Sequence, residues 1–317
     1  MSNIAEKTHA FIFEGVGLEC QGYVHLLNSE CKEQLKRYCS IVYKEIGMDL
    51  WSYLHELPYT NYGKVFHDWI SIYTIDYIVY HNYTDAGIKP GVFLGYSMGL
   101  ITALACGKAI SFEDGLKMLL CIYGYLEKSA EQQAMGVIVG MTCEDVEKVI
   151  MNSNLGESVA IASENNENCI LISGIKSSVE KVMSLSASEG ALKVKAINTP
   201  FACHSKYAEK GMEVYMDFIE RLQVSDSTVP VISSYDQEII QDSGAIKKEL
   251  GKNTIGRMYW KASIEKAFDM GFSSFFEVSL DDSISKFSKL INTDCEFISY
   301  KKFINLRLKG EQNGGLI

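Results

Sequence analysis

The segment Gly95-Tyr96-Ser97-Met98-Gly99 constrains the fold of this chain more than any other feature. An apolar run from Gly91 to Leu94 precedes it and an apolar stretch from Leu100 to Cys106 follows it, which predicts a buried strand, a sharp turn and a helix. Such a turn places the Ser97 hydroxyl at a helix N-terminus, where the Met98 amide can stabilise an oxyanion. The pattern is short, so an ordinary turn without chemistry is the alternative.

The rest of the chain alternates between predicted strands and predicted helices. This order favours an α/β fold whose large domain is α/β-hydrolase-like and built on a mainly parallel sheet. From Gly136 the predicted order changes to β-α-β-β-α-β, which is the ferredoxin-like arrangement. We therefore expect residues 1–135 and 199–317 to form a large catalytic domain, and residues 136–198 to form an inserted ferredoxin-like subdomain.

Charge and cysteine content exclude several classes of partner. The formal net charge of -10 argues against binding of nucleic acid, which requires basic patches. No apolar run is long enough to span a membrane, and the polar start of the chain does not resemble a signal peptide. The nine cysteines contain no CxxC pair, so they indicate buried thiols in a reducing compartment. We expect a cytoplasmic monomer without a metal site.

A serine nucleophile needs a base, and a histidine is suited to this role at neutral pH. Among six histidines, only His204 lies in a loop after a predicted strand, surrounded by small residues. His204 is therefore the preferred base. More than 100 residues follow it, and no acidic residue stands at a strand end between Ser97 and His204. Both observations weigh against an α/β-hydrolase proper.

In their order along the chain, these residues resemble the malonyl-CoA:acyl-carrier-protein transacylase family, which includes the acyltransferase domains of polyketide synthases. The matching segments are residues 86–90, 95–99, 103–106, 110–114, 136–141, 165–174, 203–205 and 275–278. The resemblance implies a ping-pong reaction in which Ser97 attacks an acyl thioester of coenzyme A or a carrier protein. An acyl carrier protein would then collect the acyl group on its phosphopantetheine thiol, with no permanently bound cofactor.

The resemblance also implies supporting roles. A backbone carbonyl, at a position that matches Asn253, would orient His204. The family opens with Phe-x-Gly-Gln-Gly-Ser-Gln, whereas this chain has Phe13-Glu14-Gly15-Val16-Gly17-Leu18-Glu19, so Val16 would supply the second oxyanion amide. Three further residues are expected to support the site: Tyr96, Asn165 and His67.

One departure from the family concerns the acyl group. Malonyl-selective members carry an Arg in the helix after the elbow, where this chain has Ile122 and no basic residue between Lys117 and Lys128. A malonyl carboxylate beside Ile122 would be unpaired, at a cost of roughly several kcal/mol. We therefore expect an uncharged acyl group, or one whose charge is recognised elsewhere, in a pocket formed by Cys121, Ile122 and Tyr123. The alternative is that Ile122 belongs to the core.

Three functions remain open at this point. The leading hypothesis is an acyltransferase that moves a non-carboxylated acyl group to a carrier protein in polyketide or fatty-acid-type biosynthesis. The second is an acyl hydrolase that clears acyl groups from carrier proteins. The third is a catalytically inactive scaffold, which the intact Ser97 and His204 oppose. Transfer and hydrolysis use the same two residues, so the sequence does not discriminate between them.

Overall fold

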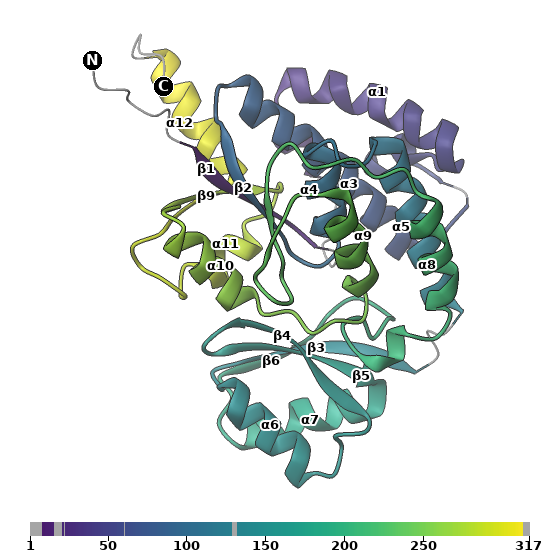
Figure 1. Cartoon of the computed structure of the whole chain (residues 1–317), viewed down its shortest axis with the longest axis vertical. Helices are drawn as coiled ribbons and strands as arrows, with labels where there is room; N and C mark the ends of the chain where they lie inside the picture. The colour runs from purple at the N-terminus through teal and green to yellow at the C-terminus, as the bar shows by residue number, and fades with distance from the viewer. Residues whose placement is uncertain (1–7, 16–20, 22, 60, 129–131, 313–317) are drawn as a thin grey trace.

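The computed structural model describes residues 8–15, 21, 23–59, 61–128 and 132–312. Two sheets organise this part of the chain, one of six strands and one of four strands. Figure 1 shows the four-stranded sheet at one end of the molecule, below a larger part that contains both termini. The expected α/β class, with a mainly parallel sheet and an inserted ferredoxin-like unit, is confirmed.

The six-stranded sheet has the order β10-β9-β1-β2-β7-β8. Its strands are β1 (His9–Phe13), β2 (Pro90–Gly95), β7 (Val231–Ile232), β8 (Ile239–Ile240), β9 (Ser274–Val278) and β10 (Glu296–Ile298). Every neighbouring pair is parallel except β7 and β8. Phe13 is the register partner of both Gly95 and Val278, so the residues that follow β1, β2 and β9 emerge at one edge of the sheet. In open parallel sheets this edge is where ligands bind.

Helices cover both faces of this sheet, because its strands are apolar on both sides. Phe11 packs its ring against Tyr83 on one face, whereas Ile12 shares the opposite core with Trp260. The helices of the larger part are η1 (Tyr23–Leu26), α1 (Ser29–Ile46), α2 (Leu50–Leu54), α3 (Lys64–Asp85), α4 (Gly99–Cys106), α5 (Phe112–Glu127), η2 (Lys206–Ala208), α8 (Met212–Arg221), α9 (Ser243–Lys252), α10 (Trp260–Asp269), α11 (Ser283–Ser288) and α12 (Tyr300–Gln312). Within the described ranges, no helix is long and apolar enough to cross a membrane.

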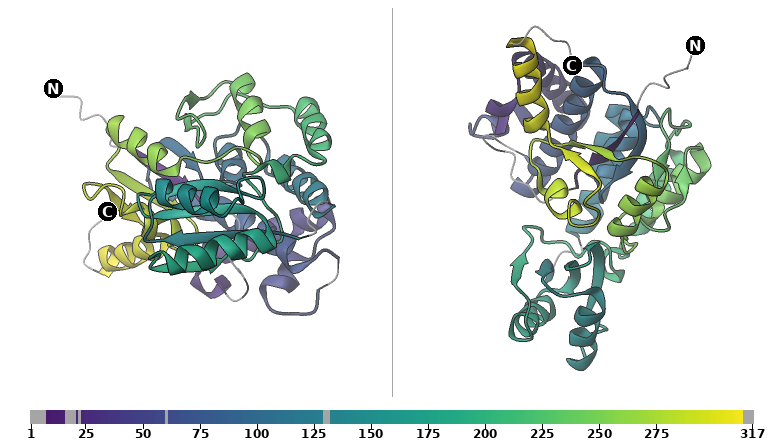
Figure 2. Two further views of the ribbon diagram at one scale, coloured as in Figure 1. Left: turned by 90° about the horizontal axis from the view of Figure 1, so that it is seen from below. Right: turned by 90° about the vertical axis from the view of Figure 1, so that its left-hand side faces the viewer.

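The inserted unit begins at Gln133 rather than at residue 136. It consists of β3 (Gln133–Val139), α6 (Cys143–Asn152), β4 (Val159–Asn166), β5 (Cys169–Ile175), α7 (Lys176–Ser188) and β6 (Lys193–Ala196). Its antiparallel sheet has the order β4-β5-β3-β6. Both helices cover the outer face, and the other face looks toward the larger part, where β4 contacts α10 and α11 (Figures 1 and 2). The two parts therefore enclose the space between them.

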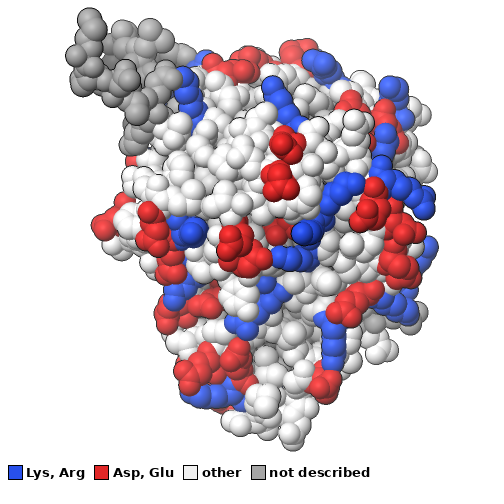
Figure 3. Space-filling model, in the orientation of Figure 1, with Lys and Arg blue, Asp and Glu red and all other residues white. Residues whose placement is uncertain are grey.

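The surface carries both signs of charge. Figure 3 shows Lys and Arg side chains interspersed with Asp and Glu side chains over the face that it displays. Some of these charged side chains form ion pairs, such as Lys206 with Glu157 at 2.6 Å and Lys252 with Asp236 at 2.7 Å. Exposed pairs of this kind contribute little to stability. The fold therefore depends mainly on its apolar cores.

Candidate active site

Ser97 lies in the turn between β2 and α4, where the backbone is tightly constrained. Its φ of 54° is left-handed, which is uncommon for a residue with a side chain. A Cβ on Gly99 would lie 2.3 Å from the carbonyl oxygen of Phe13, and a Cβ on Gly95 would lie 2.4 Å from Cα of Leu100. Glycine is therefore required at both positions, because backbone atoms of neighbouring elements occupy the space of a side chain.

The structure brings Ser97 and His204 into direct contact. Oγ of Ser97 lies 2.7 Å from Nε2 of His204, and Nδ1 of His204 lies 2.9 Å from the carbonyl oxygen of Gly256. A carbonyl only accepts hydrogen bonds, so Nδ1 carries the proton and Nε2 presents its lone pair to the Ser97 hydroxyl. The arrangement is that of a nucleophile beside its base. No carboxylate of the described residues contacts the imidazole ring.

His204 is held in a buried environment. Its side chain is 3% exposed, and its backbone amide donates to the carbonyl oxygen of Thr254 at 2.7 Å. Burial lowers the pKa of His204 to about 4, although the hydrogen bond to Gly256 partly opposes this shift. The ring is therefore neutral at pH 7, which is the form that a general base requires.

The prediction that the Asn253 carbonyl orients His204 is wrong, because the carbonyl that does so belongs to Gly256, three residues later. The carbonyl of Asn253 accepts a hydrogen bond from the Tyr235 hydroxyl at 3.1 Å, and the carbonyl that holds Nδ1 of His204 belongs to Gly256. Helix α9 ends at Lys252, and the amide of Gly256 then bonds to the Lys252 carbonyl at 2.8 Å. This turn after the helix reverses the chain, so the later carbonyl meets the histidine.

The Met98 amide is suitably placed to stabilise an oxyanion. Met98 precedes the first residue of α4, and no described residue accepts a hydrogen bond from its N–H. Free amides at a helix N-terminus attract negative charge. Val16, the expected second donor, lies outside the described residues.

Ser97 and His204 line a cavity of about 350 Å³ between the two sheets. Apolar side chains from both parts of the molecule form much of its wall: Met135, Val137, Leu171, Met258, Ile284 and Phe287. Tyr96 and Asn165 also line it, and the Tyr96 hydroxyl donates to Oδ1 of Asn165 at 2.8 Å. These two residues therefore lie beside the nucleophile, and their expected supporting role stays a prediction.

The expected acyl pocket does not form where the sequence placed it. Cys121, Ile122 and Tyr123 are absent from the wall of the cavity beside Ser97. Ile122 is fully buried in the core, and the Tyr123 ring packs 4.6 Å from the ring of Phe66. Cys121 instead lines a separate surface hollow that includes Val214. The three side chains point away from the cavity because α5 packs its apolar side against other helices.

His67 also lies outside this cavity. It is fully buried on α3, where its Nδ1 lies 3.1 Å from the carbonyl oxygen of Gly63. Its ring is surrounded by the rings of Tyr59 and Tyr53, with centroids 4.5 and 4.8 Å away. Its position therefore does not support the expected role of His67 at the site. Burial lowers the pKa of His67, which favours a neutral ring.

Glu14, which no motif of the sequence marks as functional, also lines the cavity. Glu14 follows β1 directly and is 5% exposed, and it accepts hydrogen bonds from Ser279 and, at 2.9 Å, from Ser283. Burial raises the pKa of Glu14 to about 8, and the nearby charge of Glu277 acts in the same direction. Its position in the sequence could have indicated this place. Glu14 directly follows β1, Ser97 lies in the turn after the adjacent parallel strand β2, and the residues that follow parallel neighbours emerge at the same edge of the sheet.

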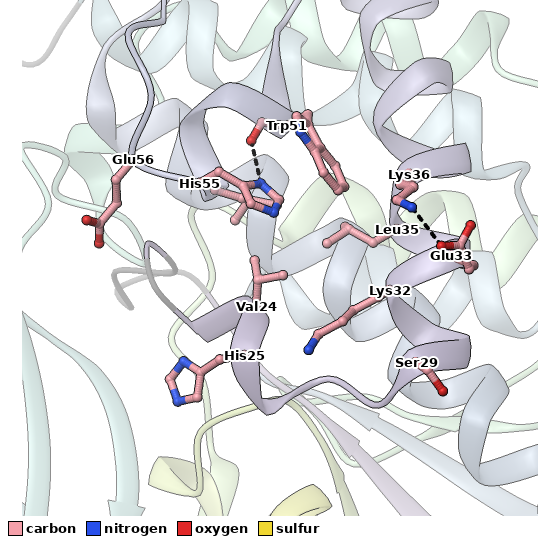
Figure 4. A pocket seen from close by; sticks show the side chains of 11 residues that line it. Val24, His25, Ser29, Lys32, Glu33, Leu35, Lys36, Trp51, His55 and Glu56 are labelled. Atoms are coloured by element: carbon pink, nitrogen blue, oxygen red, sulfur yellow. Dashed lines mark hydrogen bonds and ion pairs between the residues drawn. The ribbon is translucent and has the colours of Figure 1, made fainter.

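A second hollow, of about 570 Å³, lies over η1, α1 and α2 (Figure 4). Its wall includes the stacked rings of Trp51 and His55, 4.0 Å apart, and the ion pair of Lys36 with Glu33. Neither Ser97 nor His204 reaches it. In the part of the chain that is described, no group of three His, Cys, Asp or Glu side chains could hold a metal ion.

A serine and a histidine in contact at a strand-to-helix elbow, above a cavity shared by two sheets, define a class of acyl-transferring enzymes. The acyl transferase domain family matches residues 10–279, so the chain belongs to this family and is an acyltransferase.

Curated relatives and solved structures agree with this assignment. The chain is 23% identical over 298 residues to the malonyl CoA-acyl carrier protein transacylase of Haemophilus influenzae, covering 92% of this chain and 95% of the relative. It is 28% identical over 293 residues to PksC of Bacillus subtilis, a polyketide biosynthesis malonyl CoA-acyl carrier protein transacylase, covering 90% of this chain and 98% of the relative.

The fold matches solved structures of the same kind. The malonyl CoA-acyl carrier protein transacylase of Coxiella burnetii superposes with a TM-score of 0.86 at 22% identity, covering 96% of this chain and 97% of that one. A malonyl-transacylase solved in complex with a type II polyketide synthase acyl-carrier protein gives a TM-score of 0.88 at 18% identity, covering 96% of this chain and all of that one. At these identities the likeness concerns the fold.

Proposed function

We propose that this acyltransferase forms an ester on Ser97 from an acyl thioester of coenzyme A or a carrier protein, and passes the acyl group to the phosphopantetheine thiol of an acyl carrier protein. The observation that carries the proposal is the 2.7 Å contact between Oγ of Ser97 and Nε2 of His204. The relatives named as acyl carrier protein transacylases support this acceptor, and PksC supports a role in polyketide or fatty-acid-type biosynthesis.

The reaction would proceed in two balanced halves. Oγ of Ser97 attacks the thioester carbonyl carbon while Nε2 of His204 takes the hydroxyl proton, and the Met98 amide stabilises the oxyanion. When the tetrahedral intermediate collapses, the carbon–sulfur bond breaks and His204 returns the proton to the departing thiolate. The acceptor thiol then attacks the ester by the reverse sequence, and Ser97 regains its proton. Gly256 keeps Nδ1 protonated throughout.

We further propose that the acyl group lacks a carboxylate. Ile122 stands where malonyl-selective members carry Arg, and its side chain is fully buried away from the cavity. Of the described residues that line the cavity, Lys195 is the only Lys or Arg, and its side chain is exposed. Burying a carboxylate without a cationic partner costs on the order of several kcal/mol, because the charge loses its hydration and gains no ion pair.

Intact-protein mass measurement tests the reaction. The protein is incubated with acetyl-, butanoyl- and malonyl-coenzyme A, and an acyl carrier protein that bears phosphopantetheine is added afterwards. We expect an ester adduct with acetyl or butanoyl that persists until the carrier is added, and little adduct with malonyl. The adduct should be lost in Ser97→Ala and retained in the control Ser184→Ala, which alters an exposed serine on α7.

Each other outcome has a defined meaning. Free acid released before the carrier is added identifies an acyl hydrolase instead of a transferase. Efficient loading of malonyl contradicts the argument from Ile122. If no adduct forms and the wild type behaves like Ser97→Ala, both catalytic functions are contradicted, and the catalytically inactive scaffold is the hypothesis that remains.

The cellular location is also a proposal. The eight described cysteines are all free thiols, and six of them are buried. Free thiols in this number fit a reducing compartment, because oxidising compartments favour disulfides. We therefore propose that the enzyme acts in the cytoplasm, with coenzyme A or phosphopantetheine thioesters as substrates and no resident cofactor.

A further inference from the structure

We propose that the cavity beside Ser97 selects acyl groups that carry an amino group, and that Glu14 and Asp281 recognise this group. The inference rests on the proposed function, since it names the acyl chain that Ser97 would carry. Its chemical class is an aminoacyl thioester, in which a protonated amine lies a few bonds from the thioester carbonyl.

Glu14 is close to the reacting atoms. The residue that follows it, Gly15, packs so tightly on the elbow that a Cβ there would lie 3.2 Å from Cβ of Ser97. The Glu14 side chain lines the same cavity and is almost fully buried. Its oxygens accept hydrogen bonds from Ser279 and Ser283, which fix the carboxyl in place.

Asp281 contributes a second carboxyl to the wall of the cavity. Its side chain is half-buried, and no described residue forms a hydrogen bond or an ion pair with its carboxylate. The backbone amide of Asp281 donates to the Ser279 hydroxyl at 3.1 Å, and that hydroxyl donates in turn to Glu14. The Glu14 carboxyl and the backbone of Asp281 are thus joined through Ser279, and among the described residues no cationic side chain forms an ion pair with either carboxyl.

The charges around the cavity favour a cation over an anion. Among the described residues of its wall the only Lys or Arg is Lys195 on β6, which is exposed, so solvent screens its effect on the interior. Burial raises the pKa of Glu14 to about 8, so this carboxyl holds a proton readily near neutral pH. An ammonium group would pair with Asp281 and draw Glu14 into its ionised form, whereas a carboxylate would meet the negative charge of Asp281 and gain no ion pair. The apolar wall would hold the methylene groups of the acyl chain.

The test compares three coenzyme A thioesters of similar size: 3-aminopropanoyl (cationic), butanoyl (neutral) and malonyl (anionic). The rate of adduct formation on Ser97 is measured by intact-protein mass at pH 8. We expect 3-aminopropanoyl to load about tenfold faster than butanoyl, with malonyl slowest. Glu14→Gln and Asp281→Asn remove charge at constant shape, and each should bring the cationic and neutral rates to within about threefold.

Asp282→Asn is the matched control. Asp282 is the next carboxylate along the chain, but it pairs with Lys286 and is absent from the cavity wall. The control should keep the preference for 3-aminopropanoyl. Equal loading of the cationic and neutral groups by the wild type, or a preference that survives Asp281→Asn, overturns the inference. Failure of all three thioesters to form an adduct overturns the proposed function instead. Asp281 is only half-buried, so its variant keeps the test valid if Glu14→Gln does not fold.

Discussion

The Tyr96 hydroxyl donates a hydrogen bond of 2.8 Å to Oδ1 of Asn165, which joins the residue before the nucleophile to a strand of the other sheet. The same oxygen accepts from the Ser163 hydroxyl at 2.7 Å, so Asn165 is fixed from two sides. The Tyr96 ring packs edge-on against Trp260, with centroids 5.3 Å apart. The position of the elbow is thus coupled to the position of the inserted unit.

Tyr96→Phe should loosen this coupling. The variant keeps the ring and loses the donor, so the free energy of unfolding should fall by about 1 kcal/mol. Acylation of Ser97 should slow by a few fold, because the two walls of the cavity are less well fixed. Urea unfolding and adduct formation measure the two effects. Tyr207→Phe is the control, since it removes an exposed hydroxyl that donates to the Glu157 carbonyl at 2.6 Å. An unchanged acylation rate would mean that the bond serves stability alone.

The acid limb of the acylation rate should lie near the pKa of His204. Burial lowers that pKa from 6.5 to about 4, so the base stays neutral and the rate should vary little between about pH 5.5 and 7.5. Adduct formation from a thioester that does not titrate in this range measures the profile. A midpoint near 6.5 would contradict the burial of His204.

The same shift predicts a change of stability. Between pH 6.5 and 4, His204 is protonated in the unfolded chain but stays neutral in the folded protein. The free energy of unfolding should therefore decrease as the pH falls through this window. His204→Gln should reduce this loss, which urea midpoints at several pH values would reveal.

The pH dependence of stability that Glu14 contributes should have the opposite sign to that of His204. Its pKa is raised from 4.5 to about 8, so the folded state holds a proton that the unfolded chain releases. The free energy of unfolding should fall as the pH rises from 4.5 to 8. Glu277 and Asp76 are buried near it and have raised pKa values too, and Asp281 adds a like charge.

Glu14→Gln should make the free energy of unfolding decrease less steeply between pH 4.5 and 8, because the contribution of Glu14 to this pH dependence is removed. Urea midpoints at pH 5, 6.5 and 8 provide the measurement. Glu180→Gln, which alters an exposed residue on α7, is the control and should leave the slope as it is. An identical slope in Glu14→Gln and wild type would show that Glu14 is ionised in the folded state.

Gly99→Ala should prevent the elbow from forming. The added Cβ would lie 2.3 Å from the carbonyl oxygen of Phe13, and backbone atoms cannot yield as a flexible side chain does. We expect a loss of about 3 kcal/mol or more, seen as a lower midpoint of urea unfolding. Gly124→Ala on α5 is the matched control, because nothing lies within 4 Å of the new Cβ. Since Ala is the better helix former, this variant should gain up to ~1 kcal/mol.

Local sequence signals predicted the elbow and the inserted unit, because each depends on residues close in the chain. The apolar strand, the glycines and the following helix around Ser97 form one continuous segment. Helix α9 gave a weaker signal, since it contains Gly244 and Gly251. Its stability comes from the Asp242 cap, which accepts from the Ala245 amide at 3.0 Å, and from packing against α8.

The parts of the site that sequence did not reveal depend on packing between distant segments. Ile122 lies on a helix with apolar residues on several sides, so its direction is decided by the elements that pack against α5. The choice of Gly256 over Asn253 depends on a turn of a few residues, which a comparison of patterns does not resolve. Glu14 meets Ser279 and Ser283 only because β1 and β9 are neighbours in the sheet.

The central place of β1 also bears on how the chain acquires its fold during synthesis. β1 pairs with β2 on one side, and on the other side with β9, which the ribosome produces some 260 residues later. Until then β1 offers an open hydrogen-bonding edge, and strands in that state are prone to mispairing and aggregation. Residues 274–278 therefore cover this edge of β1, and a nascent chain halted before them would need the protection of a chaperone.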